Sequence, residues 1–78
     1  MVEVIDLRYI EEYKLDLTFS NNVSKIVDLK KKILLGKGPM YEPLKDIEFF
    51  KKVRVDKELG TVLWPNEFDI CPDLLYEM

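Results

Sequence analysis

The sequence offers few residues that could carry out catalysis. It contains no histidine, which removes the commonest general base and the commonest metal ligand. Its single cysteine, Cys71, precedes Pro72 near the predicted start of a helix, a position that can favour a reactive thiol. Asp69 and Asp73 would oppose a thiolate there, so we interpret Cys71 as a small, half-buried apolar residue rather than a nucleophile.

The carboxylates and glycines also form no recognisable motif of a catalytic, metal or cofactor site. Acid–base chemistry would need two carboxylates in one pocket, and nothing in the sequence places a pair together. The candidates are Glu11, Glu12, Glu58, Glu67 and Asp69. No Asp-x-Asp-x-Asp-Gly run predicts a calcium site, and the Gly36-Lys37-Gly38 segment lacks the spacing of a phosphate loop. We therefore expect no metal, no cofactor and no enzymatic activity.

Basic residues are concentrated in the middle of the chain. Residues 25–57 carry a net charge of +5, whereas residues 1–24 carry −3 and residues 58–78 carry −5. A functional interpretation is an anion-binding patch made of Lys30, Lys31, Lys32, Lys37, Lys51, Lys52 and Arg54. The alternative is a solvated face whose positive charge is balanced by acidic neighbours. We favour this alternative because most of these basic residues are lysines, whereas bidentate phosphate contacts need arginine.

The string Trp64-Pro65-Asn66 is the strongest candidate for recognition of a partner. An indole suits either a core or an interface, and an asparagine after a proline can fix a turn. One interpretation presents Trp64, Asn66 and Asp69 to a partner protein. The other, which we favour, is a structural corner with Trp64 in the core and Asn66 and Asp69 satisfying loop amides.

Length and composition favour one small soluble domain spanning residues 1–78. The chain is 47% hydrophobic, 12% aromatic and 35% charged, which excludes a disordered chain. Its net charge of −3 argues against nucleic-acid binding by bulk charge. One cysteine excludes an internal disulfide, and no long apolar run or signal peptide is evident, so we expect a cytoplasmic protein without membrane association.

The first half of the chain predicts an antiparallel meander. Residues 2–9 are rich in β-branched and aromatic types, and residues 13–19 alternate strictly between apolar and polar. A turn over residues 20–22, with Asn22 at positive φ, sets Phe19 opposite Val23, Leu15 opposite Val27 and Tyr13 opposite Leu29.

The second half predicts short helices around a hairpin. Asp28 and Asp46 are expected to cap helices over residues 29–35 and from residue 47, with Leu29, Ile33 and Leu34 on the dry side of the first. Residues 40–44 should be extended, because Pro43 disfavours helix at Glu42. The remaining expected elements are strands at 53–56 and 61–64 around a turn with Gly60, a strand segment at 68–70 and a last helix from Pro72.

These residues together resemble the domain of unknown function 2442 family over about Val4 to Glu77. The most specific part is the Gly-Thr-x-x-Trp-Pro-Asn string. The other matching residues are Tyr13, Leu15, Leu17, Phe19, Val27, Asp28, Leu29, Pro43, Leu44, Asp46, Phe50, Val53, Val55, Asp56, Asp69, Pro72, Leu75, Tyr76 and Glu77.

The resemblance implies a small prokaryotic α+β domain. Genes of this family often lie beside that of another small protein, an arrangement typical of toxin–antitoxin pairs, and some members precede a helix-turn-helix domain. The sequence departs from the family by carrying Asn22 and Glu67 where glycine is usual. We expect Glu67 to be less able than glycine to adopt positive φ, which would change the shape of that loop.

We therefore predict an α+β fold with a small antiparallel sheet of about five strands and two or three short helices on one face. Exposed sheet edges and a core limited by length both favour association with a protein partner or with a second copy. The leading hypothesis is a non-enzymatic protein-interaction module, antitoxin-like or adaptor. The alternatives are a regulatory, nucleic-acid-associated domain using the lysine-rich residues and, least favoured, a small enzyme.

Overall fold

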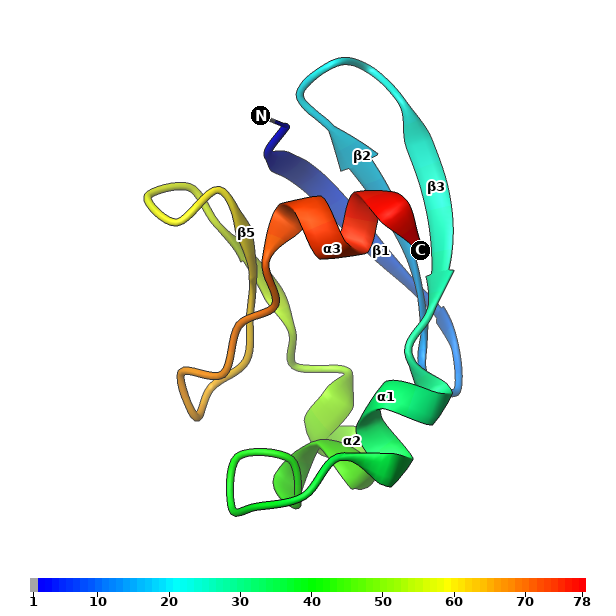
Figure 1. Cartoon of the computed structure of the whole chain (residues 1–78), viewed down its shortest axis with the longest axis vertical. Coiled ribbons are helices and arrows are strands. Elements are labelled where there is room, and N and C mark those ends of the chain that lie inside the picture. Colours follow the sequence, from blue (N-terminus) through cyan, green and yellow to red (C-terminus); the bar gives the residue numbers. More distant parts are fainter. Residues whose placement is uncertain (1) are drawn as a thin grey trace.

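The chain forms two small antiparallel sheets and short helices in a computed structural model that describes residues 2–78 (Figure 1). The first sheet has the order β1-β2-β3, and the second pairs β4 with β5. The strands are β1 (Val4–Glu11), β2 (Lys14–Phe19), β3 (Ser24–Asp28), β4 (Arg54–Asp56) and β5 (Thr61–Leu63). The helices are α1 (Lys30–Leu35), the 3₁₀ turn η1 (Pro43–Lys45), α2 (Ile47–Phe50) and α3 (Pro72–Glu77). The predicted α+β class is confirmed.

The alternation in and before β2 determines which face of the first sheet is dry. Every second side chain from residue 13 to residue 19 is at most 7% exposed, and the intervening ones are half-buried. The buried set is Tyr13, Leu15, Leu17 and Phe19. Because side chains alternate across a strand, this pattern directs the whole inner face toward one core, as the sequence predicted.

The turn after β2 has the predicted geometry. Asn22 has a φ of 68°, and the amide of Phe19 donates to the carbonyl of Val23 at 2.8 Å. Leu15 then lies opposite Val27 in the ladder. Residues directly opposite share a face, so this register joins the buried side chains of β2 to those of β3.

The five strands make two sheets rather than the single sheet that we expected. The ladder of β1 is irregular between Val4 and Asp6 and again between Tyr9 and Glu11. Such irregularities increase the local twist and interrupt pairing, which limits a continuous ladder with the second hairpin. The second sheet approaches β1 instead through one backbone bond, from the amide of Val4 to the carbonyl of Gly60 at 2.9 Å.

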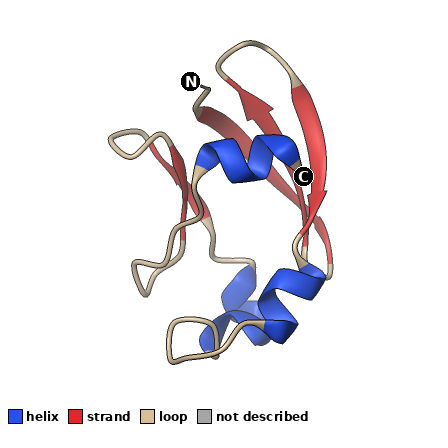
Figure 2. Cartoon of the chain, viewed as in Figure 1, coloured by secondary structure: helices blue, strands red, loops and turns tan. Residues whose placement is uncertain are grey.

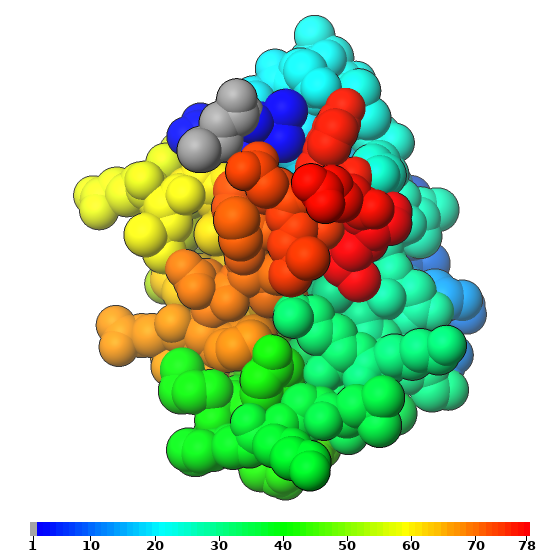
Figure 3. All heavy atoms as spheres, viewed as in Figure 1, coloured from blue at the N-terminus to red at the C-terminus, as the bar shows by residue number. Residues whose placement is uncertain are grey.

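The last helix fills the space between the two sheets. In the ribbon view α3 crosses from the side of β5 toward β3 (Figure 2), and in the space-filling view its atoms lie between those of the second hairpin and those of β3 (Figure 3). Leu75 is fully buried, and the ring of Tyr76 packs edge-on against Phe19 with centroids 5.0 Å apart. Leu74, the neighbouring residue of the same helix, is 44% exposed.

The predicted cap of α2 is confirmed, because the N-cap residue is Asp46 and its carboxylate accepts a hydrogen bond from the amide of Glu48 at 3.0 Å. The predicted cap of α1 by Asp28 is wrong, because the N-cap residue is Leu29. The carboxylate of Asp28 instead accepts from the amide of Lys30 at 2.9 Å from one residue before the cap. Helix α1 begins at Lys30, one residue later than predicted. Its dry side is narrower than predicted as well, because Leu34 is 42% exposed.

The expectation of an extended segment over residues 40–44 is wrong. Glu42 is helical, with φ −56° and ψ −48°, and Pro43 opens the 3₁₀ turn η1. Proline is favoured at the first position of a helix because its fixed φ suits that position. Leu44, which is fully buried, fixes this turn against the core, and that burial overrides the restriction that proline places on Glu42.

The second hairpin follows its prediction closely. Gly60 has a φ of 68° in the turn between β4 and β5. The carboxylate of Asp56 accepts hydrogen bonds from the amides of Glu58 and Leu59, which closes the turn. An isolated bridge between Leu63 and Asp69 confirms that the later segment returns to the sheet.

The loop after Trp64 keeps a positive φ without glycine. Glu67 has a φ of 68°, and its amide donates to the carbonyl of Trp64 at 2.9 Å. The expectation that glutamate would resist this conformation is therefore wrong. The surrounding turn holds Glu67 in the left-handed region at a local conformational cost.

We expect Trp64→Phe to lower the free energy of unfolding by about 2–3 kcal/mol, because it removes a buried hydrogen bond and leaves a cavity. Urea denaturation followed by far-UV circular dichroism measures this, since Trp64 is the only tryptophan. Leu59→Ala is the control, because Leu59 is 52% exposed and the change should stay within about 0.5 kcal/mol. Equal losses in the two variants would contradict a central role for Trp64.

We expect Glu67→Gly to raise the free energy of unfolding by about 0.5–1 kcal/mol, because glycine adopts positive φ without the clash of a Cβ. Glu58→Gly removes the same charge at an exposed position that is not at positive φ, and it should be neutral or destabilising. The same denaturation experiment compares the two. Stabilisation by both variants would point to charge rather than backbone conformation.

Candidate functional site

Trp64 lies in the core rather than on the surface. It is fully buried, and its indole Nε1 donates a hydrogen bond to the carbonyl of Phe50 at 3.0 Å. Its ring also packs against those of Phe50 and Phe68, with centroids 5.5 Å and 5.8 Å apart. The side chain is therefore not presented to a partner in this structure, in agreement with the structural alternative that the sequence favoured.

Asn66 and Asp69 differ in the hydrogen bonds that they make within the domain. The amide group of Asn66 accepts from the amide of Phe68 at 3.3 Å and donates to the carbonyl of Met40 at 3.1 Å. The bond from Phe68 stabilises the loop after β5, and the bond to Met40 ties that loop to the one before η1. Asp69 is exposed, and within residues 2–78 its backbone bridges to Leu63 while its side chain makes no hydrogen bond or ion pair. Partner binding by this loop stays a prediction, and Asp69 is its most accessible side chain.

The structure separates the seven basic residues of the predicted anion-binding patch. Lys30, Lys31 and Lys32 form the first turn of α1, and Lys37 lies in the loop between α1 and η1. Lys51 and Lys52 follow α2, and Arg54 opens β4. Three of the seven also lie near carboxylates. The ion pairs are Lys30 with Glu12 at 3.7 Å, Lys51 with Glu48 at 3.7 Å and Arg54 with Asp56 at 3.8 Å.

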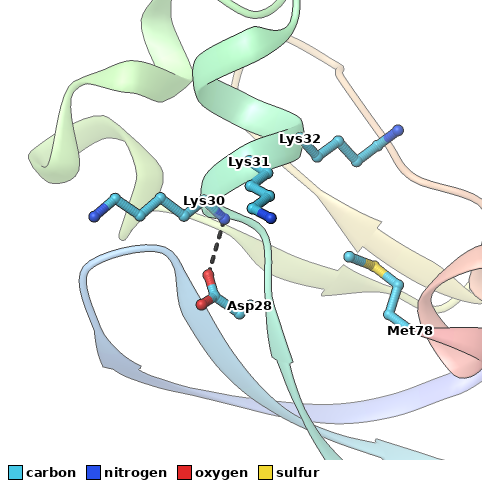
Figure 4. A pocket seen from close by; sticks show the side chains of 5 residues that line it. All are labelled: Asp28, Lys30, Lys31, Lys32 and Met78. Carbon is cyan, nitrogen blue, oxygen red and sulfur yellow. Dashed lines mark hydrogen bonds between the residues drawn. The ribbon is translucent and has the colours of Figure 1, made fainter.

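A pocket of about 390 Å³ lies beside the first turn of α1. Its lining residues are Asp28, Lys30, Lys31, Lys32 and Met78. Figure 4 shows the side chains of Lys30 and Lys32 pointing in opposite directions, with Lys31 directed toward the space between helix and strand. The lysines therefore diverge from a common centre, and Asp28 adds a negative charge to the same wall.

The remaining side chains that could react or bind a metal do not form a site. Cys71 precedes α3 and is exposed, so the half-buried position that we expected is wrong. Across residues 2–78, no three histidine, cysteine or acidic side chains come together in a way that would hold a metal ion. The same residues contain no helix with the length and apolar character needed to cross a membrane.

The most distinctive surface feature is the outer edge of β3, which we did not predict as a site. β3 is the last strand of its sheet, and its extensive contacts within residues 2–78 are with β2 alone. Figure 1 shows β3 at the margin of the ribbon, with β2 on its inner side. At the middle of this strand, Ile26 is 64% exposed.

The hydrogen bonds of the hairpin show which backbone groups of β3 are free. Phe19 donates to Val23, and Leu29 donates to Tyr13, so the odd-numbered residues of β3 face β2. In an antiparallel ladder, hydrogen-bonded and non-hydrogen-bonded pairs alternate. The amides and carbonyls of Ser24, Ile26 and Asp28 therefore point away from the sheet.

The side chains around Ile26 on the outer face are polar. Ile26 lies opposite Asp16, whose carboxylate makes an ion pair with Arg8 at 3.1 Å. Ser24 and Thr18 share a hydrogen bond at 3.2 Å one step along the sheet. A signal for this site was present in the sequence, since the predicted register already placed Ile26 opposite a charged residue. An apolar side chain at such a position is unusual for a solvated face.

The comparisons with known proteins agree with the resemblance noted above. A family model described as Protein of unknown function (DUF2442) matches residues 4–78, which include both sheets, α3 and the Trp64–Asn66 string. No significant match was found among curated proteins or among solved structures. On the evidence of this match along nearly its entire length, the chain belongs to the DUF2442 family of proteins of unknown function.

Proposed function

We propose that this domain is a non-enzymatic protein-interaction module that binds another polypeptide along the free edge of β3. The observation that carries the proposal is the open row of backbone donors and acceptors at Ser24, Ile26 and Asp28, centred on an exposed Ile26. A sheet edge of this kind pairs readily with an added strand, which supplies affinity through main-chain hydrogen bonds.

The chemistry of this edge supports binding rather than protection against it. Natural edge strands are commonly blunted by an outward lysine, a proline, a bulge or a covering segment. β3 contains no proline, its ladder with β2 is regular, and its one lysine, Lys25, points inward to bond the carbonyl of Tyr76. Covering Ile26 would add about 1 kcal/mol of apolar burial to the backbone hydrogen bonds.

The finer assignment that we propose is an antitoxin-like or adaptor component of a two-protein system. The resemblance implies gene neighbourhoods of that kind. A small domain with an open sheet edge also suits a protein that acts by binding to a partner protein. A cytoplasmic location accompanies this proposal, because the intended partner would be another protein inside the cell. Asp69, which is exposed in the loop after β5, is a second contact candidate.

We expect Ile26→Pro to abolish recovery of bound polypeptides from the source cell. Proline removes the outward amide of residue 26 without touching a bond to β2, and it blocks strand addition. Affinity purification of a tagged full chain followed by mass spectrometry compares the variant with the wild type. Untagged copies of the chain itself count among the polypeptides recovered.

The control for this experiment is Leu59→Lys, which changes an exposed apolar residue in the turn of the other sheet. It should leave the recovered polypeptides unchanged. Far-UV circular dichroism of both variants shows whether the fold is retained. Identical recoveries for wild type and Ile26→Pro, with both folded, would contradict binding at this edge.

A second candidate function is anion or nucleic-acid binding at the pocket beside α1, favoured by the presence of Lys31 and Lys32, which have no carboxylate within 4.0 Å across residues 2–78. Our proposal predicts instead that the chain, with a net charge of −3, elutes from heparin at the same low salt as an acidic control protein. Salt-dependent retention that is lost in a Lys31→Gln, Lys32→Gln double variant would support the second candidate.

A further inference from the structure

We infer that the free edge of β3 pairs with β3 of a second copy of this chain, antiparallel, with the two Ile26 residues opposite each other on a two-fold axis. The inference rests on the proposed function, because it names the polypeptide that occupies the same edge. Two-fold pairing joins identical surfaces, so the strand must be complementary to itself read in reverse. The sequence Ser24-Lys25-Ile26-Val27-Asp28 meets that condition in one register.

The hydrogen-bonding pattern first limits the registers that are possible. Residues with outward backbone groups must lie opposite one another, and these are Ser24, Ile26 and Asp28. A two-fold axis at residue 25, 26 or 27 sets at least two of them opposite outward residues of the second copy, with even residues always facing even residues. A slip by one residue would turn the outer face of one copy onto the inner face of the other.

The side chains then exclude two of the three registers. An axis at Lys25 places two ammonium side chains directly opposite each other, and like charges in that position destabilise a sheet. An axis at Val27 places Ile26 opposite Asp28 of the second copy and sets an apolar side chain against a carboxylate. Neither arrangement buries the exposed surface of Ile26 against an apolar neighbour.

The axis at Ile26 satisfies every position of the strand. Ile26 packs on its own copy, and the hydroxyl of Ser24 faces the carboxylate of Asp28, which accepts hydrogen bonds. Lys25 lies opposite Val27 on the inner face, where its ammonium already bonds the carbonyl of Tyr76 and lies 5.2 Å from that residue's ring centroid. That existing contact holds the charge away from the axis.

The backbone contribution follows from the same register. Three pairs of residues meet in the hydrogen-bonding arrangement, and each pair exchanges two bonds, giving about six bonds across the axis. The product is a continuous sheet in the order β1-β2-β3-β3-β2-β1, in which neither β3 remains an edge. The outer face of that sheet carries the paired isoleucines at its centre, flanked by the Arg8–Asp16 ion pair of each copy.

Analytical ultracentrifugation of the purified full chain tests the assembly. We expect a dimer for the wild type and for Leu59→Lys, and at least a tenfold higher dissociation constant for Ile26→Lys, which places two ammonium groups on the axis. Ile26→Pro should behave like Ile26→Lys because it removes the central donor from each copy. Circular dichroism confirms that the variants remain folded, since neither change touches a bond between β2 and β3.

Cysteine cross-linking tests the register. In a Cys71→Ser background, Ile26→Cys places two thiols on residues whose Cα atoms lie about 5.5 Å apart in a hydrogen-bonded pair, within the range of a disulfide. Ser24→Cys is the matched control on the same face of the same strand. Its copy lies four residues away, about 13 Å at ~3.3 Å per residue, so we expect dimer cross-linking for Ile26→Cys and none for Ser24→Cys.

The outcomes separate this inference from the proposed function. A monomeric wild type, or equal cross-linking at positions 24 and 26, overturns self-pairing in this register. If the monomer still recovers other polypeptides in a manner that depends on Ile26, the edge binds a different partner and the proposed function survives. If the chain dimerises equally well with Ile26→Pro, self-pairing at this edge fails. If that variant also recovers the same other polypeptides as the wild type, the proposed function fails too.

Discussion

The strict alternation of apolar and polar side chains through β2 is the constraint on which the molecule depends. β2 is the central strand of the first sheet, so its parity decides which side chains of both neighbours face the core. The same parity decides which backbone groups of β3 remain free, because residues bonded to β2 cannot also point outward. One pattern of seven residues thus determines both the dry side of the domain and the surface that we assign to binding.

The fold was largely predictable where a local pattern and the core agreed. The β2–β3 register followed from the requirement that Leu15 meet an apolar partner, and Gly60 and Asp46 behaved as their residue types predict. Predictions failed where tertiary contacts outweighed a local preference, as at Glu42 before Pro43 and at Glu67 in the left-handed region. The division into two sheets was not predicted either, because it depends on irregular pairing in β1 that cannot be inferred from residue types.

The candidate site was harder to anticipate than the fold. Sequence motifs directed attention to Trp64 and to the basic residues. The structure buries Trp64 and distributes the basic residues over α1, the loop after it, the residues after α2, and the start of β4. An edge strand has no characteristic residue, since its defining property is a missing neighbour. Only the order of the strands in space reveals that β3 has one partner where it could have two.

The position of α3 has a consequence for how the chain reaches this structure. Each sheet is assembled from segments that are close in sequence, so the meander and the second hairpin can form rapidly and separately. Their common interior closes only when α3 docks, which brings Tyr76 to Phe19 across 57 residues of chain. We therefore expect the loop-closure entropy of that docking to dominate the folding barrier, with a transition state in which the hairpins are formed and the helix is still undocked.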